Sequence, residues 1–549
     1  MHARGLAIDR FLGPVVLVLV LAGIGPLFVR SPLGPDPVMY DLQARLVGDG
    51  GVLYRDILEP NLPGAVWIHL AVRSVFGWSP EALRLFDLGW FLVAAWFATG
   101  LMPFRGSRRW LVIAFMAAGY FTLSEWCHCQ RDVWTLPFVL SAVSLRVSRF
   151  SAGGSRWNYC VALCEGVLWG CAVWLKPHVV VPAVFVVFAT WLASMKGRRV
   201  GAMLAQEGFV ILGGAVVGMT GVLWLVRHDA WSPLWSILTE WNRDYVASSG
   251  NRWSWERLWS IHERLAPWSL LHLVAAPIAL WTLGRVFIHA RSADARPVDS
   301  TALRPCVIAA LYFGWLVQSL LLQHLFDYVH VPALILAAMV VATIPTPRLA
   351  AEGSIGRVGF AAVVVLAAGF LLQGGRLSEW RRCVSGPATP ELRNRLARLP
   401  LPEWTQLAQV EQYLRQRGVR DGELTAYHTH TIHLYPALGV TPSTRYVFTE
   451  THLRLFSKRA GEIAEALARS GQRFVVSDLL EAGLEASVAL DDSDPDNWRT
   501  ACPGGALDSF PFDQPVVFRA GPYLVHEVTR PMGPVETGFF PLAAKSAGL

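Results

Sequence analysis

The chain has 549 residues, of which 53% are hydrophobic and 16% are charged, and its formal net charge is +7. Soluble globular proteins carry about 25% charged residues, so this composition excludes a chain that is soluble along its whole length. The positive charge does not indicate nucleic-acid binding, because the basic residues gather in the short connections between apolar segments.

Apolar runs of about 18–22 residues, long enough to cross a hydrocarbon core, fill residues 1–375. The first run, Phe11–Val29, lacks a cleavage site of small residues, so we interpret it as a retained span and not as a signal peptide. The pattern predicts eleven spans, at 11–29, 81–101, 109–124, 132–150, 158–175, 177–195, 208–226, 268–289, 303–323, 327–345 and 356–373.

Every second short connection along the chain is basic, which by the positive-inside rule places the N-terminus in the cytoplasm. An odd number of spans then places residues 376–549 outside the cytoplasm, on the far side of a cytoplasmic (inner) membrane. The basic residues behind this prediction are Arg4, Arg10, Arg105, Arg108, Arg109, Arg146, Arg149, Arg156, Lys196, Arg198, Arg199, Arg291, Arg296, Arg304, Arg348 and Arg357.

The first outward loop carries an aspartate directly after the first span, in the segment Gly34–Asp41. A carboxylate held partly out of water at a membrane surface has a raised pKa and can act as a general base, which is one interpretation of Asp36. The other is that Asp36 is the N-cap of a helix that starts near Pro37.

Three later outward connections also present polar groups beside the membrane. Arg131 and Asp132 either form a structural ion pair, or offer a guanidinium to a phosphate and a carboxylate to a metal or an acceptor. The other two connections contribute Lys176-Pro177-His178 and the group His324, Asp327, Tyr328 and His330.

Together these groups suit a lipid-linked phosphate. Lysine, arginine and histidine side chains can neutralise the phosphate, Asp36 and Asp132 can deprotonate an acceptor hydroxyl, and outer aromatic residues can hold an isoprenoid chain. The implied reaction is displacement of a polyprenyl phosphate from a sugar by an acceptor oxygen.

The order of these motifs resembles the membrane-embedded GT-C glycosyltransferases, in particular the protein O-mannosyltransferase and lipid A aminoarabinose transferase group. That group places an aspartate after the first span, with a tyrosine four residues later, as Asp36 and Tyr40 are placed here. The remaining matching elements are Glu59-Pro60-Asn61-Leu62-Pro63-Gly64, Gln130-Arg131-Asp132, Lys176-Pro177-His178 and Phe326-Asp327-Tyr328-Val329-His330-Val331-Pro332.

The resemblance implies a polytopic helical fold, a polyprenyl-phosphate sugar as donor, inversion at the anomeric carbon, and a lipid, glycan or protein acceptor. It implies that Asp36 is the catalytic base or a metal-assisted acceptor contact and that Asp132 is a second acid. Many members carry a glutamate where this chain has Pro37, so the use of a divalent metal such as Mg²⁺ or Mn²⁺ stays open. The substrate contacts that the resemblance implies are Tyr40, Arg131, Lys176, His178, Tyr328 and His330.

Residues 376–549 form a predicted second domain, an extracytoplasmic α/β domain, after a membrane domain at 1–375. Helices are predicted at 392–399, 404–417 and 461–468, and short strands at 423–427 and 473–477. His428, His430 and His433 have metal-like spacing, but without a nearby cysteine or acid a surface turn between strand and helix is the favoured interpretation. Cys383 and Cys502 are free to pair if the domain is outside the cytoplasm.

Two other functions fit the same topology. A transporter or flippase of lipid-linked sugars would need polar residues at mid-span and often has inverted repeats, whereas the spans hold little beyond Glu165 and no repeat. A non-catalytic envelope-assembly protein with a degenerate site is the second alternative, and Pro37 is its best support.

Overall fold

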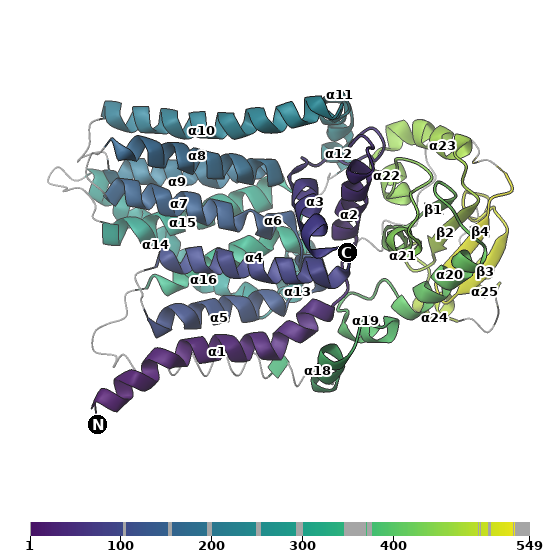
Figure 1. The fold of residues 1–549 in the computed structure, drawn as a ribbon, viewed down its shortest axis with the longest axis horizontal. Helices are drawn as coiled ribbons and strands as arrows, with labels where there is room; N and C mark the ends of the chain where they lie inside the picture. The colour runs from purple at the N-terminus through teal and green to yellow at the C-terminus, as the bar shows by residue number, and fades with distance from the viewer. Residues whose placement is uncertain are drawn as a thin grey trace.

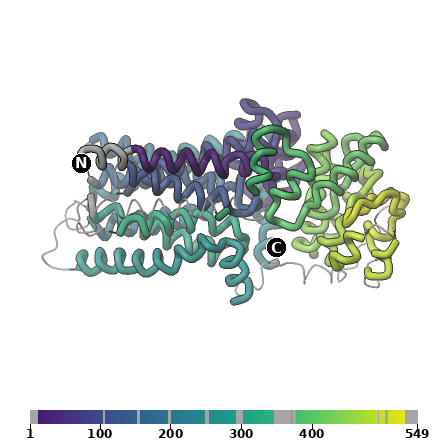
Figure 2. Tube along the Cα trace, turned by 90° about the horizontal axis from the view of Figure 1, so that it is seen from below, coloured from purple at the N-terminus to yellow at the C-terminus, as the bar shows by residue number. Residues whose placement is uncertain are grey.

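The structure is a computed structural model that describes residues 2–102, 106–151, 156–194, 200–248, 254–291, 300–344, 369–370, 376–491, 494, 496–502, 507–530 and 532. Long apolar helices lie side by side at one end of the molecule, and a smaller domain lies at the other end (Figure 1). The N-terminus lies at the bundle end that faces away from this smaller domain, as the second view also shows (Figure 2).

Seven of the described helices are long and apolar enough to cross a membrane, and an eighth span results if one bent helix pair is counted. The chain is therefore a multi-pass membrane protein, as predicted. The seven spans involve α1 (His2–Arg30), α4 (Pro80–Gly100), α8 (Trp157–Leu175), α9 (Val180–Ser194), α10 (Val200–Arg227), α14 (Leu271–Arg291) and α15 (Ser300–Val317).

Two predicted spans are joined in the bent pair, in which α5 (Ser107–Phe121) meets the segment Glu125–Phe150 at 117°. That segment contains the turn η1 (Glu125–Cys127), the short helix α6 (Arg131–Trp134) and the longer α7 (Leu136–Ser151). The predicted span at 327–345 is the shorter apolar helix α16 (Asp327–Ala342). The predicted span at 356–373 lies almost wholly outside the described residues.

Small residues let two spans approach closely. A Cβ atom added to Gly166 on α8 would lie 2.0 Å from the Val210 carbonyl oxygen on α10, and one added to Gly213 would lie 2.1 Å from the Leu163 oxygen. Close backbone contact of this kind drives helix association in lipid, where the hydrophobic effect between helices is absent. The outer side of α10 is apolar and exposed, for example at Ile211, as a lipid-facing surface must be.

The orientation argument assumed that Arg146 and Arg149 lie in a connecting loop, and this assumption is wrong. Both belong to α7 and are buried, and both donate to Glu165 of α8 and Glu207 of α10 at N–O distances of 2.5–3.5 Å. Arg146 also donates to the Thr190 hydroxyl of α9 at 3.0 Å. Two guanidinium groups and two carboxylates balance, which is how ionised groups are accommodated inside a bundle.

Two helices, α2 (Pro35–Gly48) and α3 (Gly64–Phe76), run across the end of the bundle that faces the smaller domain (Figure 1). Asp41 of α2 joins them, because it accepts hydrogen bonds from Arg73 Nε and lies 2.8 Å from His69 Nδ1, both on α3. Arg73 continues the network to the backbone oxygen of Ser79 just before α4.

The C-terminal domain contains a four-stranded sheet in the order β1-β2-β4-β3. Strand β1 (Leu424–Ala426) pairs parallel with β2 (Phe474–Asp478), which pairs antiparallel with β4 (Tyr523–Glu527), and β3 (Val516–Ala520) pairs antiparallel with β4. The first two strands were predicted, whereas the β3–β4 hairpin was not. The order of the helices is α18 (Arg376–Ser385), α19 (Pro390–Leu396), α20 (Trp404–Gln416), η7 (Thr429–His433), α21 (Leu434–Leu438), α22 (Thr449–Leu455), α23 (Ala460–Arg469), α24 (Ala486–Ala489) and α25 (Asn497–Ala501).

Backbone hydrogen bonds attach this domain to the bundle. The amides of Arg398 and Leu399 donate to the Glu125 carboxylate at 2.9–3.1 Å, and the Leu58 amide donates to the Arg445 oxygen at 2.9 Å. Cys383 and Cys502 are both free thiols and lie in separate apolar clusters. The predicted domain boundary at 375 falls among residues that the structure does not describe and stays a prediction.

The buried network on α7 generates a stability prediction. Glu165→Gln leaves two buried guanidinium groups with one carboxylate, and removal of one partner of a buried pair costs about 3–5 kcal/mol. We expect a loss of that size in the free energy of unfolding, measured by denaturation in detergent micelles. Glu465→Gln removes an exposed helix pair with Arg469 and serves as the control, with an expected cost of about 0–1 kcal/mol. Equal losses in the two variants would contradict the network's role.

Candidate functional site

Asp36 lies in the first turn of α2 and points toward α6. The helix begins at Pro35, and its N-cap is Gly34, so the interpretation of Asp36 as an N-cap is wrong. Gln130 Nε2 donates to Asp36 Oδ2 at 3.1 Å. Burial raises the pKa of Asp36, while Gln130 and Arg131 oppose that increase. A carboxylate in this state is well suited to accept a proton.

Asp132 pairs with Lys176, not with Arg131. Lys176 follows the last residue of α8 in an extended conformation and donates from Nζ to Asp132 Oδ1, and both side chains are almost completely buried. Asp132 Oδ2 has no hydrogen-bond partner among the described residues. The predicted ion pair between Arg131 and Asp132 is therefore wrong, and the charge of Lys176 is already largely neutralised.

Arg131 consequently keeps a free guanidinium. It has no hydrogen-bond or ion-pair partner among the described residues, yet Tyr40, Asp132, Tyr328 and Glu59 all lie within electrostatic range of it. A half-buried guanidinium with unused donors is a favourable site for a phosphate, because its planar fork can donate to two oxygens at once.

Helix α16 contributes an aromatic wall and a histidine. The Tyr328 ring lies 5.9 Å from Lys176 Nζ and 5.9 Å from the Trp126 ring. His330 is 6% exposed, and within the described part of the chain its Nε2 has no hydrogen-bond partner. His330 and His178 both lie within electrostatic range of the Asp132–Lys176 pair.

The structure therefore brings all eight predicted site residues to one place, at the end of the bundle that faces the C-terminal domain. They come from four separate segments of the chain: α2, the α6 region, the end of α8 with the turn η2 (Pro177–Val179), and α16. The catalytic and binding roles given to them stay predictions. The residues are Asp36, Tyr40, Arg131, Asp132, Lys176, His178, Tyr328 and His330.

Glu59 belongs to the same cluster, although sequence reasoning gave it no role. It is 7% exposed and accepts hydrogen bonds from the Asn61 amide and side chain. Burial raises its pKa to about 7, against the lowering effect of Arg131. Its place in a polar outer loop before Asn-Leu-Pro-Gly was the available signal.

The C-terminal domain covers the cluster and contributes His430. This histidine lies within electrostatic range of Glu125 and Asp36, and burial lowers its pKa to about 4, so it is neutral near pH 7. His428, His430 and His433 are 3–7% exposed, so their interpretation as a surface turn is wrong. His428 is enclosed within the domain, where its Nδ1 accepts from the Asp478 amide, and η7 packs against α2.

The residues present do not fit a divalent metal held by the protein alone. Within the described ranges, no three His, Cys, Asp or Glu side chains come together as ligands. Pro37, next to Asp36 in the chain, offers no ligand, and Lys176 occupies one oxygen of Asp132. We derive no step through a metal.

Comparisons with known proteins support the fold. No family model matches the chain, and no curated protein matches its sequence. Among solved structures, ArnT from Cupriavidus metallidurans bound to undecaprenyl phosphate aligns with a TM-score of 0.51 and 15% identity, covering 95% of this chain and 99% of that one. ArnT from the same organism in the apo state gives 0.52 and 16%, covering 97% and 100%.

This likeness over nearly the whole of both chains confirms the predicted fold, a polytopic helical membrane domain followed by a C-terminal α/β domain, arranged as in ArnT. At this level of identity the likeness concerns the fold, and the chemistry of this chain has to be argued from its own residues.

Glu59 generates a prediction about pH. Between about pH 4.5 and 7 the unfolded chain has lost the Glu59 proton while the folded protein retains it, so the folded state loses stability as the pH rises through this window. Glu59→Gln removes this loss. We expect the variant to gain on the order of 1–3 kcal/mol relative to wild type between pH 5 and pH 7.5, measured by unfolding at both values.

The matched control is Glu485→Gln in the C-terminal domain, where the side chain is exposed. Its difference from wild type should be the same at both pH values. A pH-independent difference for Glu59→Gln as well would show that the Glu59 proton is not held by folding.

Proposed function

We propose that the chain is an inverting glycosyltransferase that moves a sugar from a polyprenyl-phosphate donor to an acceptor hydroxyl at the outer face of the cytoplasmic membrane. One observation carries the proposal: a carboxylate with a raised pKa, Asp36, lies in the same buried cluster as the unpaired guanidinium of Arg131. The neighbour with the same fold that binds undecaprenyl phosphate supports the choice of donor.

In this proposal Arg131 holds the phosphate of the donor. The two charges of the Lys176–Asp132 pair largely cancel, so the attraction of the site for an anion comes mainly from Arg131. Asp132 then acts by positioning Lys176, which can donate its remaining hydrogens to a phosphate oxygen. His330, His178 and Tyr328 add hydrogen-bond donors around the same point.

Asp36 takes the proton of the acceptor hydroxyl. The acceptor oxygen forms a bond to the anomeric carbon from the side opposite the phosphate, the bond between that carbon and the phosphate oxygen breaks, and its electron pair leaves with the polyprenyl phosphate. The configuration at the anomeric carbon inverts. The hydrogen bond from Gln130 orients the carboxylate for this transfer.

The buried network on α7 argues against the transporter alternative. Arg146 lies 14 residues after Asp132, which places it about 21 Å further along the bundle at ~1.5 Å per residue. Its carboxylate partners are fully engaged by the two arginines, so Glu165 is a structural residue and does not line a polar path between spans.

Helix α2, which carries Asp36, and the C-terminal domain lie at the bundle end opposite the N-terminus (Figure 1). We infer that the N-terminus is cytoplasmic and that the C-terminal domain is extracytoplasmic. Cysteine introduced at Arg381 on α18 should react with an impermeant maleimide in intact cells, whereas cysteine at Arg156 before α8 should react only after lysis. Labelling of both positions in intact cells would refute this orientation.

Asp36→Asn tests the function. The variant keeps the shape of the side chain but cannot accept the proton, so sugar transfer should fall by about 10²–10⁴-fold. The measurement is transfer from radiolabelled polyprenyl-phosphate sugars to a membrane acceptor fraction by purified protein. Asp49→Asn, an exposed position at the end of the same helix, is the control and should retain full activity. Equal transfer by wild type and Asp36→Asn would eliminate Asp36 as the base.

A further inference from the structure

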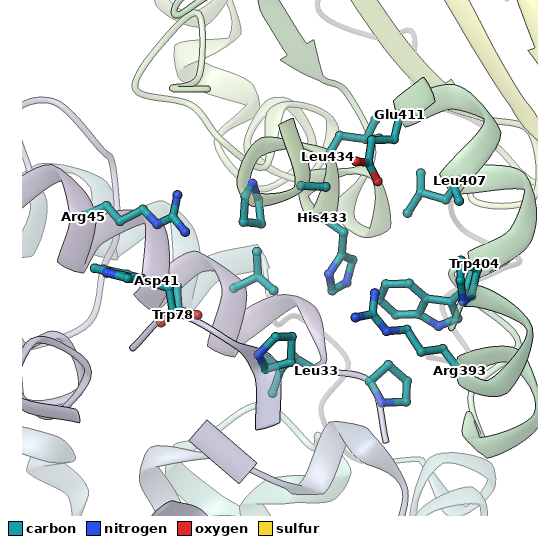
Figure 3. Close-up of a pocket in the computed structure, with 17 residues that line it drawn as sticks. Leu33, Asp41, Arg45, Trp78, Arg393, Trp404, Leu407, Glu411, His433 and Leu434 are labelled. Atoms are coloured by element: carbon teal, nitrogen blue, oxygen red, sulfur yellow. The ribbon is translucent and has the colours of Figure 1, made fainter. Parts of the chain in front are cut away.

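A second cavity, of about 250 Å³, lies between the outer end of the bundle and the C-terminal domain. Its floor includes Leu33, Val38 and Asp41 near the start of α2, and its opposite wall comes from α19, α20 and α21 (Figure 3). At ~30 Å³ per water molecule it has room for a single sugar ring or headgroup, but not for a long lipid chain.

Helix α2 separates this cavity from the cluster around Asp36. At about 3.6 residues per turn, Asp36 and Tyr40 share one face of the helix, whereas Val38, Asp41 and Arg45 share the opposite face. The first face belongs to the candidate catalytic cluster and the second lines the cavity. The two sites therefore lie back to back on one helix.

The acidic groups of the cavity are already neutralised. Both oxygens of Asp41 are engaged by Arg73, and one also contacts His69. Glu411 accepts a hydrogen bond from Arg415 at 2.6 Å and lies within electrostatic range of Arg393. Each carboxylate thus has a guanidinium partner of its own outside the pair Arg45 and Arg393.

The guanidinium groups of the two arginines in the cavity, in contrast, are not engaged in hydrogen bonds with any residue that the structure describes. The Arg45 guanidinium lies 4.6 Å from the Trp78 ring, and that of Arg393 lies 5.3 Å from the Trp404 ring. Neither guanidinium has a hydrogen-bond or ion-pair partner among the described residues. The cavity thus holds two sets of unused, positively charged donors, each beside an indole.

His433 projects from the C-terminal domain into the middle of the cavity, with Arg45 on one side and Arg393 and Trp404 on the other (Figure 3). It is 7% exposed, and its Nε2 has no hydrogen-bond partner in the described part of the chain. Burial, together with His430 and Arg393, lowers the pKa of His433 to about 3. The ring is therefore neutral and can exchange a hydrogen bond with a hydroxyl group.

We propose that this cavity binds a saccharide unit that carries a phosphate or a carboxylate. The exposed indole of Trp78 packs against the sugar ring, the guanidinium groups of Arg45 and Arg393 bind the anionic substituent, and His433 binds a ring hydroxyl. The inference rests on the proposed function for one point only: the bound unit is a part of the acceptor that lies away from the reacting hydroxyl.

Direct binding tests this assignment without any turnover. Purified full-length protein in detergent micelles is titrated calorimetrically with glucose 6-phosphate, glucuronate, glucose and inorganic phosphate. We expect the first two ligands to bind more tightly than the last two. Binding of inorganic phosphate as tight as that of glucose 6-phosphate would overturn the saccharide assignment.

Two substitutions then locate the site. Arg393→Ala and Arg45→Ala should each weaken the binding of the preferred ligand by about tenfold or more, because each removes charge-assisted hydrogen bonds. Arg395→Ala lies on the same helix as Arg393 but pairs with Glu379 outside the cavity, so it should bind as wild type does. If Arg393→Ala does not fold, the affinity of Arg45→Ala for the preferred ligand is the test. Wild-type affinity in a folded Arg393→Ala or Arg45→Ala variant would overturn the proposal.

Variants of the catalytic cluster distinguish the two sites. Asp36→Asn and Arg131→Ala should bind the preferred ligand with unchanged affinity, because they lie behind α2. Loss of binding in Arg131→Ala with retention in Arg45→Ala would assign the ligand to the catalytic cluster and overturn the proposal. Failure of wild-type protein to transfer any sugar would refute the proposed function and would leave the binding result unaffected.

Discussion

The buried ion pair between Lys176 and Asp132 determines how the site is arranged. It joins the end of α8 to α6, two segments 44 residues apart in the chain, at the end of the bundle that faces the C-terminal domain. A lysine at this depth is costly unless it is paired, and the pairing fixes both side chains. Since Asp132 is used in this way, the adjacent Arg131 is left without a partner, and the unpaired guanidinium is the feature that makes the cluster suitable for a phosphate.

The C-terminal domain lies against the cluster and contributes to its electrostatics. Its amides at Arg398 and Leu399 donate to the Glu125 carboxylate, and His430 lies within electrostatic range of Asp36. Burial raises the pKa of Asp36 and of Glu59, because a carboxylate in an apolar environment holds its proton more tightly. The carboxylates of the cluster therefore come from the membrane domain, and the docked domain adds a neutral histidine beside them.

Much of this arrangement follows from the sequence, because a membrane span requires a long apolar run and polar residues then gather in the connections. That constraint located all eight candidate residues in outward connections. The sequence did not predict which charged side chains pair with each other. Arg131 and Asp132 are adjacent in sequence, but adjacent residues on a helix do not face each other, so Asp132 had to pair elsewhere.

The N-cap of α2 was misplaced by two residues, because Pro35 at the first helical position makes Gly34 the cap. The β3–β4 hairpin was missed although the two-residue connection Gly521-Pro522 contains a glycine at φ +53°. Burial of His428, His430 and His433 depends on tertiary packing, inside the C-terminal domain and of η7 against α2, for which a single sequence contains no local signal.

Helix α2 explains why a catalytic site and a second binding cavity can coexist here. Its first three turns carry Asp36 and Tyr40 on one face and Val38, Asp41 and Arg45 on the other, so any shift of the helix moves both sites together. Asp41 anchors it through Arg73 to α3 and to the backbone before α4. A ligand bound between Arg45 and Arg393 would bridge α2 and the C-terminal domain, and it would therefore stabilise the docked position that brings His430 within electrostatic range of Asp36. Under the proposed function, binding of the acceptor in this cavity and completion of the cluster around Asp36 would then be thermodynamically linked.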